Sequence, residues 1–157
     1  MGKVITFAQQ KGGAGKTTTL VHLAHSWAHH GRAVGLVDLD PQRSLTSWAN
    51  LHRETNLNAI SSKDWKAGVD IRDSAKKHDV TLVDCPGNAD ILLRSAIRES
   101  DLVLIPCQPT GLDVWATNAV LDLCRKEGKP ARVILNRVPA RGGTVEEALE
   151  MLREHGA

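Results

Sequence analysis

The stretch that decides the fold reads Lys11-Gly12-Gly13-Ala14-Gly15-Lys16-Thr17-Thr18. It follows an apolar run at residues 4–8 and precedes a segment with helical periodicity from residue 19 to about residue 30. A glycine-rich loop between a strand and a helix can enclose phosphate groups, because glycines let successive backbone N–H groups turn inward. The following helix adds the positive end of its dipole. This order of elements predicts a phosphate-binding loop.

Two side chains of the loop have expected tasks. Lys16 can reach the β- and γ-phosphates of a nucleotide, and the hydroxyl of Thr17 can bind Mg²⁺. The usual P-loop pattern has glycine at position 10, where this chain has Gln10. In exchange, a second lysine, Lys11, begins the loop.

A pair of acids follows the second apolar run, residues 33–38, in the sequence Asp38-Leu39-Asp40-Pro41-Gln42. Alternating residues of an extended chain point to the same side, so the two carboxylates are expected to lie together. Pro41 ends the strand. The carboxyl end of a strand beside a P-loop is where chemistry is expected in an open α/β sheet.

A third apolar run, residues 80–84, ends in Asp84-Cys85-Pro86-Gly87. An acid after a buried strand downstream of a P-loop is the Walker B arrangement, in which Asp84 is expected to hold Mg²⁺. Gly87 allows the backbone to approach the γ-phosphate and to move when that phosphate leaves.

Apolar runs and helical segments alternate along the chain. The expected strands are residues 3–8, 33–38, 80–84, 101–106 and 131–137, with a short edge strand at 57–60. The expected helices are residues 16–30, 44–52 with a cap near 42–44, 69–78, 88–99, 112–127 and 144–155. In the helix at 88–99 we expect four residues to face inward: Ile91, Leu92, Ala96 and Ile97. The alternation predicts an α/β P-loop NTPase fold, a three-layer sandwich of a mostly parallel sheet with helices on both faces.

Length and composition indicate one domain, residues 1–157, with an ordinary soluble balance of 41% hydrophobic and 24% charged residues. The net charge of +2 is compatible with a weak nucleic-acid surface. Aromatic residues are only 3% of the chain, which argues against a single-strand binder built on stacking. Three cysteines without a CxxC pair argue against a zinc site or a disulfide framework and indicate free buried thiols.

Two sets of polar residues leave alternatives open. The histidines of the first helix, His22, His25, His29 and His30, have helical spacings that could suggest a metal site, although solvated histidines are the simpler interpretation. Five basic residues are candidates for contact with DNA, with solubilising surface charge as the alternative: Arg94, Arg98, Arg125, Lys126 and Arg132.

With its three motifs in order, the chain resembles the ParA/MinD family of deviant Walker-A ATPases. The resemblance rests on residues 11–18, on Val37-Asp38-Leu39-Asp40-Pro41-Gln42 and on Leu82-Val83-Asp84-Cys85-Pro86-Gly87. Gln10 and the Asp-Pro-Gln sequence resemble the ParA branch in particular. The similarity extends through Asn136-Arg137, and relatives continue for at least one more strand and further helices.

The resemblance implies a role for each motif residue. Lys11 would reach across a nucleotide-sandwich homodimer to the phosphates held by the other subunit, much as an arginine finger does. Asp40 would orient or activate the attacking water, and Asp38 would support the metal and its waters. Thr17 and Asp84 would complete the Mg²⁺ shell. The residues implied to contact ATP are Gly12, Gly13, Ala14, Gly15, Lys16, Thr17, Thr18, Asn136 and Arg137.

The resemblance also implies partners. ParA relatives bind DNA non-specifically as ATP dimers, a ParB-like or cargo-adaptor partner stimulates their hydrolysis, and the cycle positions plasmids, chromosomes or protein cargo. A cytoplasmic, nucleoid-associated protein is expected. MinD relatives use a membrane instead, but the acidic, short C-terminal segment does not resemble their targeting helix, so we expect no membrane contact. A metabolic or metal-cluster enzyme on the same scaffold is the alternative, and a binding module with negligible turnover is a third possibility.

Overall fold

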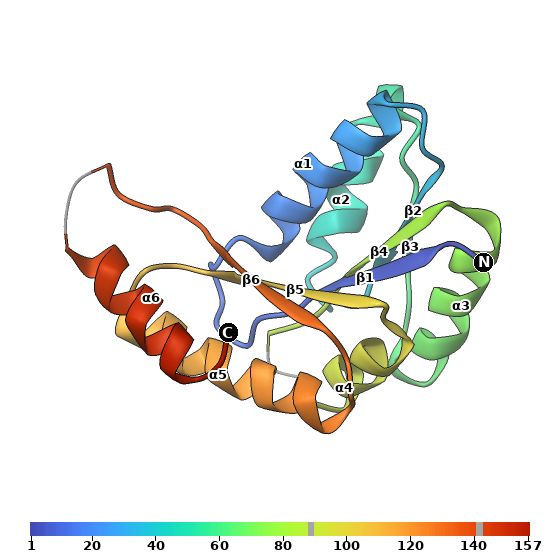
Figure 1. Ribbon diagram of the computed structural model, residues 1–157. Coiled ribbons are helices and arrows are strands. Elements are labelled where there is room, and N and C mark those ends of the chain that lie inside the picture. Colours follow the sequence, from blue (N-terminus) through green and yellow to red (C-terminus); the bar gives the residue numbers. More distant parts are fainter. Residues whose placement is uncertain (88–89, 141–142) are drawn as a thin grey trace.

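The computed structural model describes residues 1–87, 90–140 and 143–157. Within them, six strands form one sheet in the order β3-β2-β4-β1-β5-β6 (Figure 1). The strands are β1 Lys3–Phe7, β2 Val34–Asp38, β3 Ala59–Ser61, β4 Val80–Asp84, β5 Leu102–Cys107 and β6 Ala131–Leu135. Every neighbouring pair is parallel, which confirms the predicted fold class.

Helices cover both faces of this sheet. The α-helices are α1 Lys16–His29, α2 Ser44–Leu51, α3 Ala67–Lys77, α4 Asp90–Glu99, α5 Gly111–Lys126 and α6 Thr144–Glu154. In Figure 1, α1 and α2 lie on one side of the strands, whereas α3, α4 and α5 lie on the other and α6 runs beside α5. Two short 3₁₀ helices, η1 Arg53–Thr55 and η2 Asp64–Lys66, flank β3.

The predicted element boundaries agree with the structure within about two residues, as is usual for periodicity arguments. The expected short edge strand is β3, and the segment at 63–66 contains η2. The expected helix at 88–99 is described from Asp90 onward, and its first two predicted residues lie outside the described part of the chain. The N-cap residue of α2 is Arg43, within the expected cap region at 42–44, but its side chain makes no capping hydrogen bond.

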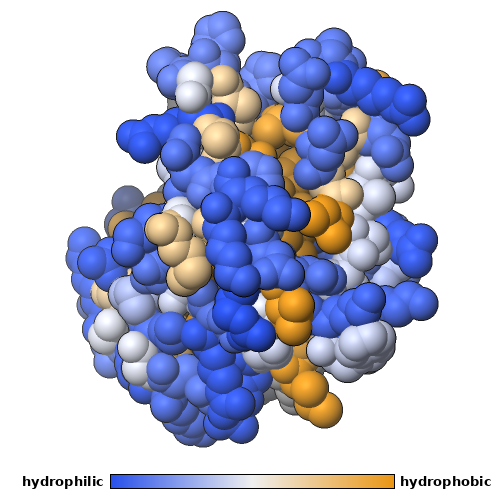
Figure 2. Space-filling model, turned by 90° about the vertical axis from the view of Figure 1, so that its right-hand side faces the viewer, coloured by the Kyte–Doolittle hydropathy of each residue, from blue (hydrophilic) through white to orange (hydrophobic). Residues whose placement is uncertain are grey.

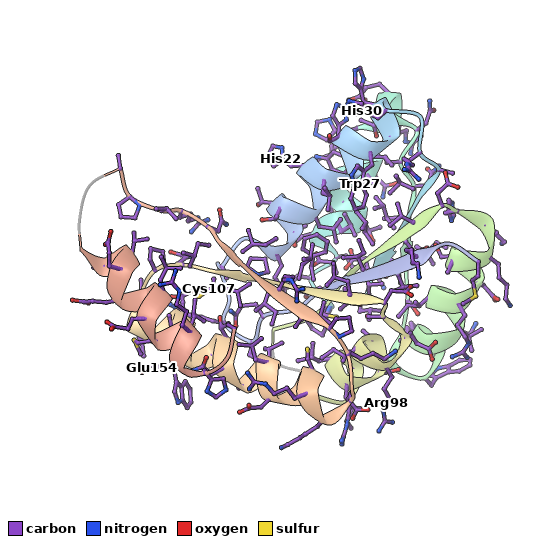
Figure 3. All side chains as sticks on the ribbon, in the orientation of Figure 1. His22, Trp27, His30, Arg98, Cys107 and Glu154 are labelled. Atoms are coloured by element: carbon purple, nitrogen blue, oxygen red, sulfur yellow. The ribbon has the colours of Figure 1, made fainter. Side chains whose placement is uncertain are left out.

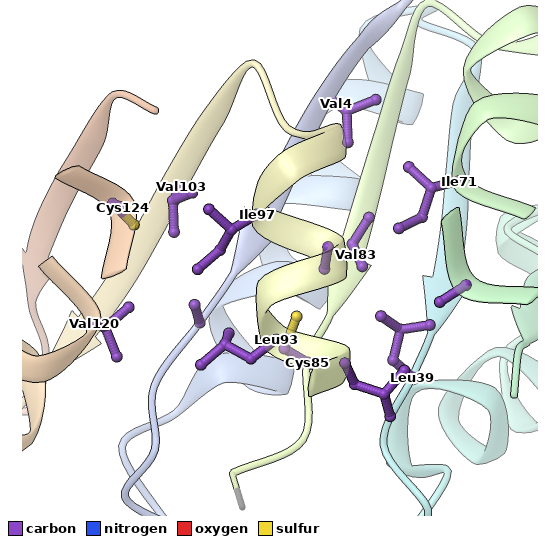
Figure 4. Packing of buried hydrophobic residues seen from close by; sticks show 14 of the residues in the cluster. Val4, Leu39, Ile71, Val83, Cys85, Leu93, Ile97, Val103, Val120 and Cys124 are labelled. Carbon is purple, nitrogen blue, oxygen red and sulfur yellow. The ribbon is translucent and has the colours of Figure 1, made fainter. Parts of the chain in front are cut away.

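The core forms two main layers, one on each face of the sheet. In the layer under α3, α4 and α5, Leu93 and Ile97 of α4 pack over Val4 of β1 and Val83 of β4 (Figure 4). The opposite layer joins α1 and α2 to the sheet through residues such as Leu20 and Leu45. All five residues of β2 and of β4 are buried, because strands inside a parallel sheet are covered on both faces.

The register of the central strands aligns their carboxyl ends. Phe7 at the end of β1 pairs with Asp84 of β4, and Asp84 in turn pairs with Asp38 of β2. Adjacent strands lie about 4.8 Å apart. The loop after β1 and the acids of β2 and β4 therefore share one edge of the sheet.

The surface at the amino ends of the strands, opposite the edge that carries the motifs, is largely polar. Figure 2 shows the right-hand side of Figure 1, where the N-terminus lies, and hydrophilic residues cover most of this face, with hydrophobic atoms confined to narrow strips between them. The helices thus shield the sheet, and the chemistry-bearing motifs gather at the other edge.

One expectation for α4 is wrong. Ile91, predicted to face inward, is 85% exposed, whereas Leu93 is 1% exposed. The predicted partners Leu92, Ala96 and Ile97 are buried as expected. Ile91 lies three and seven residues before Arg94 and Arg98, so it shares their solvent-facing side of α4, whereas Leu92 and Leu93 in the same turn face the core.

These exposures predict a contrast between two substitutions in α4. Leu93→Ala should lower the free energy of unfolding by about 2–5 kcal/mol, because it removes buried methyl groups and leaves a cavity. Ile91→Ala, the matched control in the same helix, should change it by less than ~0.5 kcal/mol. Urea denaturation of both variants measures the difference, and equal losses would contradict this packing.

Candidate nucleotide-binding site

A cavity of about 530 Å³ opens at the carboxyl edge of the sheet. It is lined by Gln10, Gly12, Gly13, Gly15, Lys16, Thr17, Thr18, Asp40, Pro41, Gln42, Pro86, Gly87 and Arg137. All three motifs found in the sequence thus contribute to one hollow. Its volume lies within the range of about 300–1,000 Å³ that is usual for small-molecule sites.

Carbonyl groups of the loop are held from outside by side-chain amides. Gln108, after β5, donates to the Gly13 carbonyl at 3.0 Å, and Asn136, after β6, donates to the Ala14 carbonyl at 2.9 Å. Within the described part of the chain, the N–H groups of Gly12, Gly13, Ala14 and Gly15 have no acceptor. The loop therefore keeps a set of backbone donors for an anion, as a phosphate cradle requires.

Two glycines permit close approaches around the loop. Gly15 has φ of +96°, and a Cβ there would collide with the Asn136 amide. A Cβ on Gly87 would lie 3.0 Å from the Gln10 carbonyl. A larger residue at position 87 would therefore push the turn after β4 away from the start of the loop.

Thr17 and Asp84 meet at the base of the cavity. The Thr17 hydroxyl donates to Asp84 Oδ2 at 2.6 Å, while Asp84 Oδ1 is buried and has no partner among the described residues. Burial raises the pKa of Asp84 to about 7, Asp38 and Asp40 add to the rise, and the Thr17 hydrogen bond and the charge of Lys16 oppose it. A hydroxyl and an unsatisfied carboxylate oxygen side by side fit Mg²⁺, which prefers a few oxygen ligands completed by phosphates and water.

Asp38 is completely buried, and both of its oxygens are already engaged. Oδ2 accepts from the N–H and the hydroxyl of Thr46, each at 2.8 Å, and Oδ1 accepts from the Asp40 N–H at 3.1 Å. Asp38 therefore stabilises the first turn of α2 in place of a capping side chain. Oδ1 accepts a single hydrogen bond, so it keeps one lone pair for the predicted contact with the metal or its waters.

Asp40 lies on the wall of the cavity, partly exposed, where an attacking water could reach it. Its Oδ1 accepts from the Gln42 N–H at 2.9 Å, which fixes the carboxylate in a local turn. Asp38, Asp40 and the glycine-rich loop therefore lie close together, as the sequence predicts.

Lys11 is paired within its own chain. Its Nζ lies 2.5 Å from Oδ2 of Asp113, a completely buried carboxylate in the first turn of α5. Burial opposes ionisation of Asp113, but hydrogen bonds from Lys11 and Thr110 outweigh it and lower the pKa of this carboxyl. The lysine side chain keeps 39% exposure. The cation predicted to serve a neighbouring subunit is therefore held by a carboxylate of its own chain, and its neighbours Gln10 and Gly12 line the cavity.

Arg137 and Asn136, both predicted to contact the nucleotide, have different positions relative to the cavity. Arg137, with φ of +53°, lines the cavity. Asn136 uses its amide on the loop and on the Arg137 N–H, so it supports the cradle in this structure. Thr18 lines the cavity, and Lys16 is buried to 9% exposure with its head group at the same wall.

The candidate basic surface is partly neutralised. Arg94 and Arg98 both pair with Glu127, and their hydrogen bonds, first that of Arg98, lower the pKa of Glu127 to about 2. Arg125 pairs with Asp122. These three arginines are paired with carboxylates of their own chain. This pairing favours solubilising surface charge, rather than contact with DNA, as their role.

Histidines and cysteines form no second centre in the described residues, where no group of three or more His, Cys, Asp or Glu could hold a metal. His22 and His30 project away from the sheet on α1 (Figure 3). Cys85, Cys107 and Cys124 are free and buried, as predicted. An exposed cysteine pair for an interfacial cluster is thus missing from the described part of the chain.

A second cavity of about 460 Å³ lies among α5, β6 and α6 and contains none of the motif residues. The cavity at the loop is both the larger of the two and the one that contains the motif residues.

Sequence reasoning missed several residues that build this site: Gln9, Thr46, Gln108 and Asp113. Gln9 is completely buried and donates to the Pro106 carbonyl and to the Thr117 hydroxyl, at 3.1 and 2.8 Å, which anchors the start of the loop to β5 and α5. A glutamine directly after an apolar strand was the available signal. The partners of Thr46 and Asp113 are visible only in three dimensions.

Comparison with known proteins agrees with these features. The family model described as "CobQ/CobB/MinD/ParA nucleotide binding domain" matches residues 5–157. The chain is 40% identical over 129 residues to Protein ParA of Rhizobium radiobacter, an alignment that covers 79% of this chain and 57% of that protein. It is 30% identical over 146 residues to the maintenance of carboxysome distribution protein A of Halothiobacillus neapolitanus, covering 87% of this chain and 67% of that protein.

A solved structure shares the fold. A plasmid partition protein from Borrelia burgdorferi, bound to AMPPNP, superposes with a TM-score of 0.82 at 23% identity, covering 98% of this chain and 83% of that one. The chain thus spans 57% and 67% of the length of the two sequence relatives.

The buried position of Asp84 predicts a pH-dependent effect of one substitution. The pKa of about 7 in the folded state exceeds the ordinary value of 3.8, so the folded protein binds more protons between these values and its stability falls as pH rises through them. Asp84→Asn cannot ionise. Relative to wild type it should gain stability between pH 4 and pH 7.5, by at most about 4 kcal/mol.

Urea denaturation at both pH values in the presence of EDTA measures this gain. Asp122→Asn, which removes an exposed carboxylate, is the control. A stability difference between Asp84→Asn and wild type that stays constant with pH would show that Asp84 titrates normally.

Proposed function

The chain belongs to the CobQ/CobB/MinD/ParA family of nucleotide-binding domains, and we propose that it is a ParA-type ATPase that dimerises on ATP and positions plasmid, chromosome or protein cargo. The observation that carries the proposal is the single cavity in which the glycine-rich loop, Asp40 and the turn after β4 meet. We propose that residues 1–157 form one such ATPase domain.

The loop would bind the phosphates of ATP. Its unpartnered backbone donors and Lys16 supply positive potential at one wall of the cavity. Thr17 and Asp84 would hold Mg²⁺, which neutralises charge on the phosphates when bound. Arg137 and Asn136, at the end of β6, remain the candidates for contact with the rest of the nucleotide.

Asp40 would hold the water that attacks the terminal phosphate, so that ATP and water give ADP and phosphate. Its position at the cavity wall and the fixed orientation of its carboxylate support this role. Asp38 would act mainly by positioning, because it ties the start of α2 to the segment that carries Asp40. Turnover without a partner is expected to be slow.

Lys11 would leave Asp113 and reach the phosphates of a second subunit. The partial exposure of this side chain, 39%, and its position between two residues that line the cavity support this proposal, because a partly exposed lysine can turn outward on its flexible stem. The buried carboxylate would hold the lysine in the meantime, so dimer formation exchanges one charge partner for another.

The remaining partners follow the ParA branch. We propose non-specific DNA as the surface on which the dimer acts, an adaptor protein as the activator, and a cytoplasmic location at the nucleoid. Lys126 and Arg132 have no carboxylate partner among the described residues and are the better remaining candidates for phosphate contact.

A MinD-like protein acting on a membrane is the alternative. None of the described helices combines the length and the apolar character that crossing a bilayer requires. The sequence similarity to a ParA and to a protein that maintains carboxysome distribution favours the ParA-type proposal.

Sedimentation with ATP, with ADP and without nucleotide, each with and without plasmid DNA, tests the proposal. We expect a dimer only with ATP, and DNA binding by that dimer that weakens as salt increases. A chain that remains monomeric with saturating ATP would contradict the dimer, and DNA affinity independent of salt would exclude phosphate contacts.

Two substitutions should separate the steps. Lys11→Ala should retain ATP binding and lose the dimer, because the charge that crosses the interface is missing. Asp40→Ala should form the dimer and reduce hydrolysis by about 10²-fold or more. Phosphate release and sedimentation measure the two effects, and wild-type turnover in both variants would show that the proposed mechanism is wrong.

Removing the partner of Lys11 should favour the dimer. Asp113→Asn keeps the shape and the Thr110 contact but no longer holds the ammonium group by charge. An ion pair whose lysine remains partly exposed contributes on the order of 1 kcal/mol, so ATP-dependent dimerisation should tighten by about fivefold. Asp122→Asn, in the same helix, is the control, and an unchanged dimerisation constant in Asp113→Asn would contradict the exchange.

A further inference from the structure

A separate cavity of about 370 Å³ lies on the other side of the segment that carries Asp40. We call it the Trp65 pocket, and its lining residues are Leu39, Asp40, Pro41, Arg43, Ser61, Ser62, Lys63 and Trp65. It shares only Asp40 and Pro41 with the nucleotide cavity. From its charge and its exposed aromatic ring, we propose that this pocket binds an acidic peptide segment of a partner protein.

The described lining of the Trp65 pocket carries two cations, Arg43 and Lys63, against one carboxylate, Asp40, and is therefore net positive. Arg43 and Lys63 are exposed and form no ion pair with any side chain that the structure describes. Asp40 accepts from the Gln42 N–H, and Asp70, next to the pocket, accepts the Ser62 hydroxyl at 2.5 Å. The side chain of Asp64 lies outside the described part. The exposed cations therefore favour an anionic ligand.

Trp65 gives the pocket an apolar surface beside this charge. Its side chain is 78% exposed, and Lys66 Nζ lies 4.9 Å from the ring centroid. A large exposed indole next to cations is a composition that recurs at the centres of protein interfaces, where aromatic and arginine side chains supply most of the binding energy.

An acidic peptide fits these features better than nucleic acid does. Carboxylates can bind Arg43 in bidentate fashion and Lys63 singly, while an apolar side chain of the same peptide covers Trp65. A DNA duplex needs an extended row of cations for its phosphates, but here two cations surround a small hollow with Asp40 in its wall. Single strands need successive stacking platforms, and Trp65 is the one aromatic residue that lines the pocket.

The position of the pocket suggests what binding does. Arg43 adopts a left-handed conformation with φ of +53° between Asp40 and α2, and its N–H donates to the Asp40 carbonyl. A peptide held by Arg43 therefore touches the short segment whose other side lines the nucleotide cavity. This consequence rests on the proposed function, but binding to the pocket itself does not.

The test uses the full chain without nucleotide or Mg²⁺, so its result is independent of the proposed ATPase cycle. A fluorescein-labelled peptide of glutamates around a central leucine serves as the probe, and its anisotropy reports binding. Lys63→Glu and Trp65→Ala should each weaken binding by about tenfold or more, since both change a central contact.

Two matched controls distinguish binding at the pocket from general electrostatic attraction and from non-specific hydrophobic binding. Lys77→Glu makes the same charge change at an exposed lysine of α3, and Trp115→Ala removes an indole that is 74% exposed. Each should change the affinity by less than about twofold. Circular dichroism confirms that all four variants are folded.

Several outcomes would overturn the proposal. One is peptide binding that is absent from wild type up to about millimolar concentration. Another is equal weakening by Lys63→Glu and Lys77→Glu, which would indicate general attraction. The third is a single-stranded oligonucleotide of equal charge that binds more tightly than the peptide and is lost in Lys63→Glu, which would make this a nucleic-acid site.

Discussion

Parallel pairing of β1, β2 and β4 in one register is the constraint on which the candidate site depends. The register places Phe7, Asp84 and Asp38 in a row across the sheet. A slip of one residue would turn Asp84 to the opposite face and separate it from Thr17. The buried strands prevent such a slip, because each residue of β2 and β4 packs against helices on one side or the other.

Electrostatics at this edge is unfavourable without a ligand. Three carboxylates lie close together, and Asp84 is buried with one oxygen that lacks a partner in the described residues. Asp113 has a second such oxygen, and it holds Lys11 with the other. Such groups destabilise an isolated fold, so their presence points to charges that arrive with a ligand or a second subunit.

The segment between β2 and α2 connects the nucleotide cavity with the Trp65 pocket. Asp38 holds the first turn of α2, Asp40 faces the nucleotide cavity, and Arg43 faces the Trp65 pocket. Five residues therefore link a nucleotide site to a candidate partner site, with a strained arginine at the junction. A conformational change on one side of this segment would therefore alter the binding site on its other side.

The fold class, the order of the elements and the residues of the three motifs could all be predicted from the sequence, because apolar periodicity and phosphate chemistry act over short stretches of chain. The prediction failed for Ile91, which lies on the solvent-facing side of α4 together with Arg94 and Arg98, although its neighbours Leu92 and Leu93 are buried. It located the N-cap region of α2, where Arg43 lies, but it missed Asp38 as the side chain that accepts from the first turn of this helix. Three contacts became visible in the folded chain alone: Lys11 pairs with a carboxylate 102 residues away, Asn136 supports the loop, and Trp65 lines the same pocket as Asp40. These contacts depend on how distant strands pack and align, and no local pattern encodes that.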